Sequence, residues 1–190
     1  MRAAQLLVAT AAYHANINLQ EVEQFLAGFI DHLVYKQDLP ELQKCLTDGD
    51  VVVKDVNDII NDFMKGDLAD IVKGVEAAIA LVKALPTDLA ECKNVEDDVK
   101  KITTWISQAA TPSGLAHIAE NVMANWSNIQ TDIGTITTDV QTDKFEDAGE
   151  QTGDILELAL GKIQYSEKDK AYDWGVVRQY NPDISFNPIF

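Results

Sequence analysis

The sequence predicts an all-α protein, a single multi-helix bundle of about six helices with one disulfide and an extended C-terminal arm. Three observations predict this architecture. Apolar residues recur at steps of three and four between Leu19 and Ile163, which is the period of amphipathic helices. The chain has two cysteines, and its composition changes sharply after Ile163. We therefore divide it into an N-terminal apolar segment (1–15), a helical bundle domain (16–163) and a C-terminal arm (164–190).

The N-terminal segment resembles a secretory signal in its make-up. Arg2 gives it a charged start, an apolar stretch follows that is interrupted only by Gln5 and Thr10, and Ala15 is a small residue at a plausible cleavage point. This stretch is too short to span a bilayer. The alternative is a first helix that packs on the domain. We expect a signal peptide and hence a secreted, extracellular protein.

Helices follow one another through the bundle domain. The first begins near Leu19 and ends before Pro40, and the second closes near Gly66. Asp67 is a good N-cap for the third, which Pro86 is expected to stop. The fourth covers about 95–110, the fifth covers about 112–140 as one long helix or two nearly collinear ones, and the last covers about 144–162. The residues predicted to face the core in the first two helices are Val22, Phe25, Leu26, Phe29, Ile30, Leu33 and Val34, then Val52, Val56, Ile59, Ile60 and Phe63.

The fifth helix begins at Thr111, a capping residue that is followed by proline. Leu115 and Trp126 are predicted to lie on its buried stripe, because they share the spacing of the isoleucines that follow. In the last helix Gly149 and Gly153 stand four residues apart. That spacing favours close contact with a neighbouring helix.

The cysteines and a glycosylation sequon point to the same compartment. An even pair of cysteines in an exported chain favours a disulfide between Cys45 and Cys92, the alternative being two buried free thiols. Asn125-Trp126-Ser127 is an N-glycosylation sequon, so Asn125 is a candidate glycan site.

The charge balance argues against a nucleic acid partner. The chain carries 31 acidic and 15 basic side chains and a formal net charge of −16. Such a chain repels nucleic acid phosphates, so we expect no nucleic acid partner. The acidity favours solubility, and the alternative is a surface that buffers cations or binds a basic partner.

No reaction can be assigned from the sequence. His14, His32 and His117 have no second ligand at the helical spacing of a zinc site, and His32 is expected at a surface boundary. The acids from Asp48 to Asp62 do not follow the calcium-loop pattern. Phosphate-loop patterns are also absent from the sequence. We expect no catalytic residue, no metal site, no cofactor and no enzymatic activity.

The C-terminal arm combines aromatic residues with prolines. Pro182 and Pro188 make another core helix improbable. Aromatic residues in an extended segment are typical of an arm that docks into a groove, although the arm could instead wrap its own domain. The candidate anchors are Trp174, Tyr180, Ile184, Phe186 and Phe190.

A set of loose motifs gives a family resemblance. These are Phe25-Leu26-Ala27-Gly28-Phe29, Leu42 three residues before Cys45, Phe63 before Gly66-Asp67, Leu85-Pro86 with Cys92 shortly after, and the helix from Ala148-Gly149 to Leu160-Gly161. With the signal-like start, this pattern resembles small secreted helical proteins of protists, ciliates in particular. The resemblance covers about Asn16 to Gly161. It implies secretion, an all-α fold and a Cys45–Cys92 bridge, and it implies no activity.

Together these observations predict a secreted, non-enzymatic structural protein that assembles with other copies of itself. The arm of one subunit would dock on the next and so build an extracellular filament or lattice. The alternative is a carrier of a lipid or other apolar ligand held within the helical bundle.

Overall fold

The computed structural model describes residues 17–34, 40, 42 and 50–163, and within these ranges all regular secondary structure is helical. Its α-helices are α1 (Leu19–Val34), α3 (Asp50–Lys65), α4 (Leu68–Asp88), α5 (Glu96–Ala109), α6 (Pro112–Ala116), α7 (Ile118–Ala124), α8 (Trp126–Gln141) and α9 (Phe145–Leu160). A short 3₁₀ helix, η1 (Lys93–Val95), precedes α5. The all-α prediction is confirmed, but the described residues contain eight α-helices where about six were expected.

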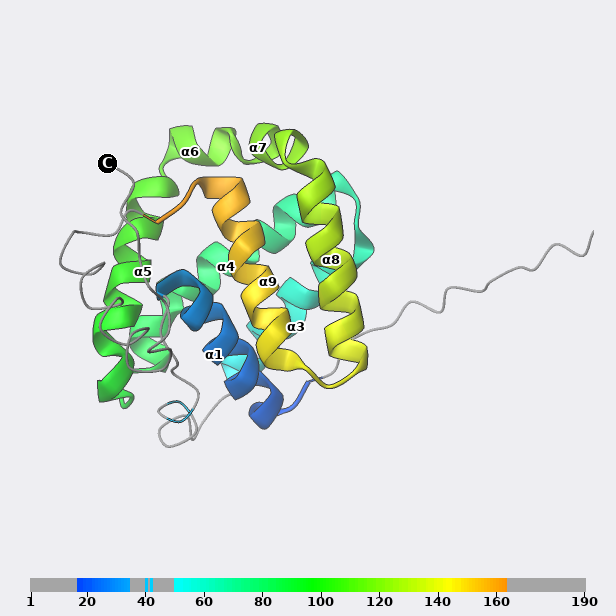
Figure 1. The fold of residues 1–190 in the computed structure, drawn as a ribbon. Coiled ribbons are helices and arrows are strands. Elements are labelled where there is room, and N and C mark those ends of the chain that lie inside the picture. The colour runs from blue at the N-terminus through cyan, green and yellow to red at the C-terminus, as the bar shows by residue number, and fades with distance from the viewer. Residues whose placement is uncertain (1–16, 35–39, 41, 43–49, 164–190) are drawn as a thin grey trace, which may run out of the picture.

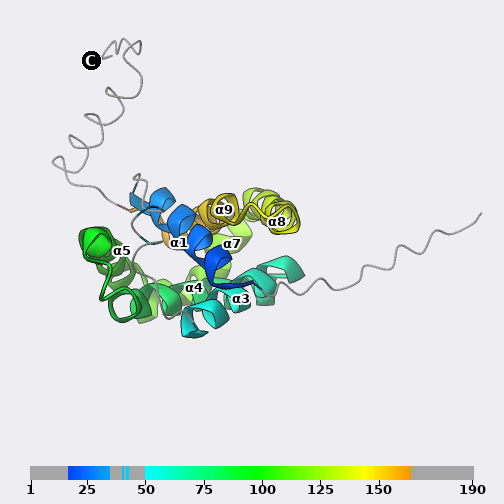
Figure 2. The ribbon, with the colours of Figure 1, turned by 90° about the horizontal axis from the view of Figure 1, so that it is seen from below.

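The helices form two layers. Helices α1, α9 and α8 lie side by side in one layer, and α3 and α4 lie in the other (Figures 1 and 2). Helix α5 closes one side by packing against both α4 and α1, while α6 and α7 cross one end of the bundle. The predicted apolar stripes meet between the layers, where Phe25, Phe29 and Phe63 are among the largest fully buried side chains.

Glycines bring α1 and α9 into the most extensive helix pair of the fold. A Cβ atom at Gly28 would overlap the carbonyl oxygen of Glu146, and one at Gly149 would overlap that of Phe25. Both positions therefore require glycine, because the two backbones are in contact there. The predicted close helix contact at Gly149 is confirmed.

The predicted caps and one predicted stop had different outcomes. The Asp67 side chain accepts a hydrogen bond from the Asp70 backbone N–H at 2.9 Å, and Thr111 caps α6 through the Gly114 N–H at 3.1 Å. The stop at Pro86 was wrong, since α4 continues to Asp88. Pro86 lies in the last turn and is exposed, where its ring has room and its missing N–H removes only one intrahelical hydrogen bond.

The predicted long helix over 112–140 was also wrong. It is broken at His117 and at Asn125 into three helices. The Asn125 side chain donates from Nδ2 to the carbonyl oxygens of Asn121 at 3.0 Å and Leu158 at 3.1 Å. Such bonds compete with helical hydrogen bonds and redirect the chain. As a result Leu115 and Trp126, predicted to be buried, are 40% and 38% exposed.

Candidate functional site

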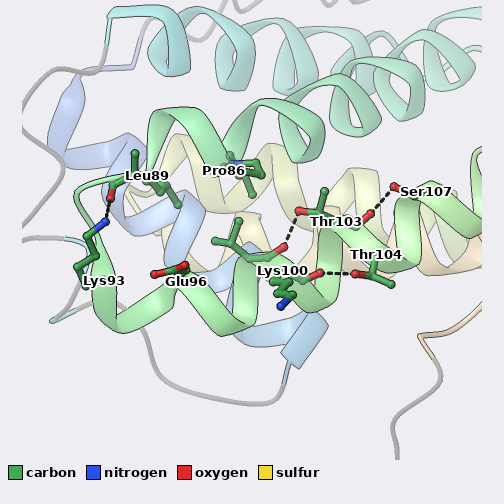
Figure 3. A pocket seen from close by; sticks show the side chains of 11 residues that line it. Pro86, Leu89, Lys93, Glu96, Lys100, Thr103, Thr104 and Ser107 are labelled. Atoms are coloured by element: carbon green, nitrogen blue, oxygen red, sulfur yellow. Dashed lines mark hydrogen bonds between the residues drawn. The ribbon is translucent and has the colours of Figure 1, made fainter.

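A surface groove lies between the end of α4 and the length of α5 (Figure 3). Its volume is about 410 Å³, within the range typical of ligand pockets. Buried apolar side chains from both helices contribute to its lining, among them Leu85, Leu89 and Val99. The remaining lining residues are Pro86, Ala90, Lys93, Glu96, Lys100, Thr103, Thr104 and Ser107.

The hydroxyl groups along α5 in this groove already have partners. The hydroxyls of Thr103, Thr104 and Ser107 each donate to a backbone carbonyl one turn earlier, at 2.6, 2.7 and 2.8 Å (Figure 3). Lys93 Nζ donates to the carbonyl oxygen of Ala90 at 2.7 Å. An occupant therefore need not supply hydrogen bonds to these groups, which suits an apolar ligand. The charged lining residues are Lys93 and Lys100, which are basic, and Glu96, which is acidic, so the groove carries a net positive charge on an acidic molecule.

The chain leaves α9 beside α5. Trp105 on α5 donates from Nε1 to the carbonyl oxygen of Gly161 at 3.1 Å. The segment that follows α9 runs toward α5 (Figure 1). Ile163, where the described part of the domain ends, is 8% exposed. Residues 161–163, which we call the root of the C-terminal arm, thus lie against α5, and α5 forms one wall of the groove.

A second cluster joins α1 to α9. His32 Nε2 lies 3.8 Å from an Asp154 carboxylate oxygen and 3.9 Å from Oε2 of Glu157. The Glu157 side chain is 3% exposed, while those of His32 and Asp154 are 24% and 39% exposed. The other carboxylate oxygen of Glu157 accepts a hydrogen bond from the Ile163 N–H at 3.4 Å. These side chains could hold a metal ion, since one donor atom from each lies within 4.8 Å of the others.

Asp132 on α8 borders this cluster. Burial is the main reason that its pKa is raised to about 6, and the neighbouring Asp154 carboxylate raises it further, while His32 opposes the shift. For Glu157, burial alone would raise the pKa. The His32 imidazole and the Ile163 N–H together outweigh burial and lower this pKa below its ordinary value.

Sequence reasoning missed this cluster. His32 was expected at a surface boundary, and its local sequence offers no second ligand. The structure supplies the carboxylates from α9, far along the chain. The only signal was the i, i+3 spacing of Asp154 and Glu157, which places both on one helix face.

The predicted site residues fall partly outside the described ranges. Cys92 is buried and is not a free thiol, but Cys45 lies outside the described residues, so their pairing stays a prediction. The apolar segment 1–15 and the arm anchors Trp174, Tyr180, Ile184, Phe186 and Phe190 also lie outside them.

Asn125 is half-buried at the α7–α8 junction. Its Nδ2, the atom that would carry a glycan, donates both hydrogen bonds described above. Attachment of a glycan would cost at least one of them. Glycosylation of Asn125 also stays a prediction.

Comparison with known proteins identifies the family. The sequence model of a family described as Secreted protein B-like (SctB-like) matches residues 7–160, most of the bundle domain. The chain belongs to the Secreted protein B-like family. Membership supports the expected secretion, although it carries no support for a protist origin. No curated protein and no solved structure matches the chain. Within the described ranges no helix of this family member combines the length and apolar character that a membrane span requires.

Proposed function

We propose that this secreted protein is a non-enzymatic building block, in which the C-terminal arm of one subunit docks into the α4–α5 groove of another. The observation that carries the proposal is the groove itself, with its apolar lining and its internally satisfied hydroxyls. Apolar and aromatic side chains of the arm are suitable occupants of such a groove.

The position of the arm root supports the same occupant. The 27-residue arm would start after Ile163, close to the point where Trp105 on α5 donates to the carbonyl oxygen of Gly161. At about 3.3 Å per extended residue, such an arm could reach on the order of 90 Å, enough to reach a neighbouring subunit. Asp183 stands among the candidate anchors, and the groove edge offers Lys93 and Lys100 as opposite charges. Docking from subunit to subunit is a head-to-tail contact, which continues into a filament or lattice when the rotation does not close.

A blocked groove tests this proposal in the full-length chain. Thr104→Trp should fill the groove and reduce assembly at least tenfold, as measured by light scattering and negative-stain microscopy. Thr131→Trp is the matched control, because Thr131 is an exposed helical threonine whose hydroxyl also donates to a carbonyl one turn earlier. It should assemble like the unmodified chain, whereas Phe186→Ala should assemble weakly.

Two results would contradict the proposal. If the unmodified chain is monomeric at every concentration, the protein does not self-assemble. If Thr104→Trp assembles normally, the groove is not the docking site. The carrier alternative would use the same groove, and native mass spectrometry would then detect a small apolar molecule that is lost in Thr104→Trp.

The covalent features expected of a secreted chain belong to this proposal. We expect a Cys45–Cys92 disulfide. By restricting the unfolded chain, this bridge would stabilise the folded protein by about 4 kcal/mol. Peptide mapping without reduction should recover the two cysteines in one linked fragment. The intact mass of protein from a secreting host would show whether Asn125 carries a glycan.

A further inference from the structure

The cluster between α1 and α9 contains donor atoms that lie within ion-pair distance of one another but beyond hydrogen-bond distance. The distances of 3.8 and 3.9 Å from His32 Nε2 to the two carboxylates exceed those of hydrogen bonds. Within the described part of the protein, His32 Nε2 is buried and has no hydrogen-bond partner. A buried polar atom in this state is costly unless something binds it.

Asp132 provides a second, independent observation. This residue is 9% exposed, so it is more than nine-tenths buried, and its Oδ2 has no hydrogen-bond partner among the described residues. It interacts with both Asp154 and His32. Three carboxylates therefore gather around one imidazole, with Glu150 and Lys162 as further charged groups nearby. An additional cation would relieve their mutual repulsion.

Gly153 makes room for the His32 imidazole against α9. A Cβ atom at residue 153 would lie 2.9 Å from His32 Cδ2 and 3.1 Å from His32 Cβ. Only glycine at this position lets the ring lie against α9, one turn from Glu157. The ring is therefore held between its two acidic neighbours by the packing of the two helices.

We propose that His32, Asp154 and Glu157 bind a divalent first-row transition cation, of which Zn²⁺ fits best. One imidazole nitrogen with two carboxylate oxygens is a donor set that zinc accepts, whereas Ca²⁺ and Mg²⁺ prefer oxygen alone. In a tetrahedral zinc site the donors lie roughly 3.4 Å apart. Side-chain movement of about half an ångström would bring each carboxylate to that distance from His32 Nε2, and the two carboxylate oxygens, now within 4.8 Å of each other, would also draw together. The partial exposure of Asp154 and His32 leaves a path for entry.

Titration of the full-length protein with Zn²⁺ alone, after dialysis against a chelator, tests the site. Calorimetry should show one site with a Kd in the micromolar range, and the melting temperature should rise with Zn²⁺. His32→Gln and Asp154→Asn should each weaken this binding at least tenfold. Co²⁺ in place of Zn²⁺ should give visible absorption bands that both substitutions abolish.

His117→Gln is the matched control. His117 Nδ1 lies 2.7 Å from a Glu120 carboxylate oxygen, but both side chains are exposed and the pair lacks the second carboxylate of the cluster. This variant should bind Zn²⁺ like the unmodified chain. Should His32→Gln fail to fold, Asp154→Asn decides, because its side chain lies at the accessible edge.

Three results would overturn the proposal. The first is the absence of a saturable Zn²⁺ site in the unmodified protein. The second is Zn²⁺ binding that His117→Gln weakens as much as Asp154→Asn does. The third is Ca²⁺ binding tighter than Zn²⁺ binding, which would remove the imidazole from the assignment. In the first two cases the cluster is an ion-pair network that joins α1 to α9, and in the third the carboxylates alone hold the cation.

Discussion

The buried acidic residues are unusual, because carboxylate side chains normally lie at the surface. Asp98, Asp132, Asp139 and Glu157 are all nearly inaccessible. Of these, Asp132 has the clearest consequence, because burial and the Asp154 carboxylate raise its pKa to about 6. The folded state therefore retains a proton on Asp132 that the unfolded chain releases near its ordinary pKa of 3.8.

The protonation of Asp132 predicts a pH dependence of stability. Between about pH 4 and pH 6 the folded state binds more protons than the unfolded chain, so the free energy of unfolding falls as pH rises through this window. Asp132→Asn removes the charge and should be more stable than the unmodified chain by about 3 kcal/mol at pH 7.5, and by little at pH 4. Urea unfolding with a chelator present measures both values. An equal difference at the two pH values would contradict this account.

At the scale of elements, the contact between α1 and α9 depends on glycine. Gly149→Ala would drive a methyl group into the Phe25 carbonyl oxygen. We expect a loss of about 3 kcal/mol or more in the free energy of unfolding, since backbone cannot move aside as a side chain can. Denaturant unfolding monitored by circular dichroism measures the loss.

Gly134→Ala is the control for this substitution. Gly134 is an exposed glycine within α8, and no atom lies near the position of its missing Cβ. Replacing a helical glycine there should stabilise the protein by about 0.5 to 1 kcal/mol. If both variants lost stability equally, helix propensity rather than close packing would explain the result at Gly149.

Helix positions were predictable from the sequence where the apolar face of a helix packs on the core. The stripes in α1 and α3 and the caps at Asp67 and Thr111 depend on residues within a few turns, so local reasoning was sufficient. The break at Asn125 was not predictable in the same way, because its side chain bonds to Leu158 on another helix. The cluster around His32 was missed for the same reason, since its carboxylates come from α9 and become neighbours only when the layers pack.

At the scale of the whole molecule, net charge opposes assembly. Each subunit carries a formal charge of −16, so copies repel one another at low ionic strength. The screening length falls from about 20 Å near 20 mM salt to about 4 Å near 500 mM. Assembly through the α4–α5 groove should therefore strengthen as sodium chloride rises over this range.

Light scattering across that salt series distinguishes two driving forces. Apolar docking predicts larger particles at high salt. If contacts between the arm and the groove-edge lysines dominated instead, high salt would dissociate the particles. The Thr131→Trp chain should follow the unmodified one throughout.

Glu157 lies where two regions of the molecule meet. One oxygen of its carboxylate faces His32, and the other accepts the Ile163 N–H at the root of the arm. A cation bound at the first oxygen would change the hydrogen bond that the second oxygen accepts from Ile163, so under the proposed metal site ion binding would be coupled to the chain that follows Ile163. Because such coupling is reciprocal, an assembled lattice that favours one arm position would also retain the ion more strongly than free subunits. A chelator in the surroundings would then loosen the material, and the dissolving material would release its metal.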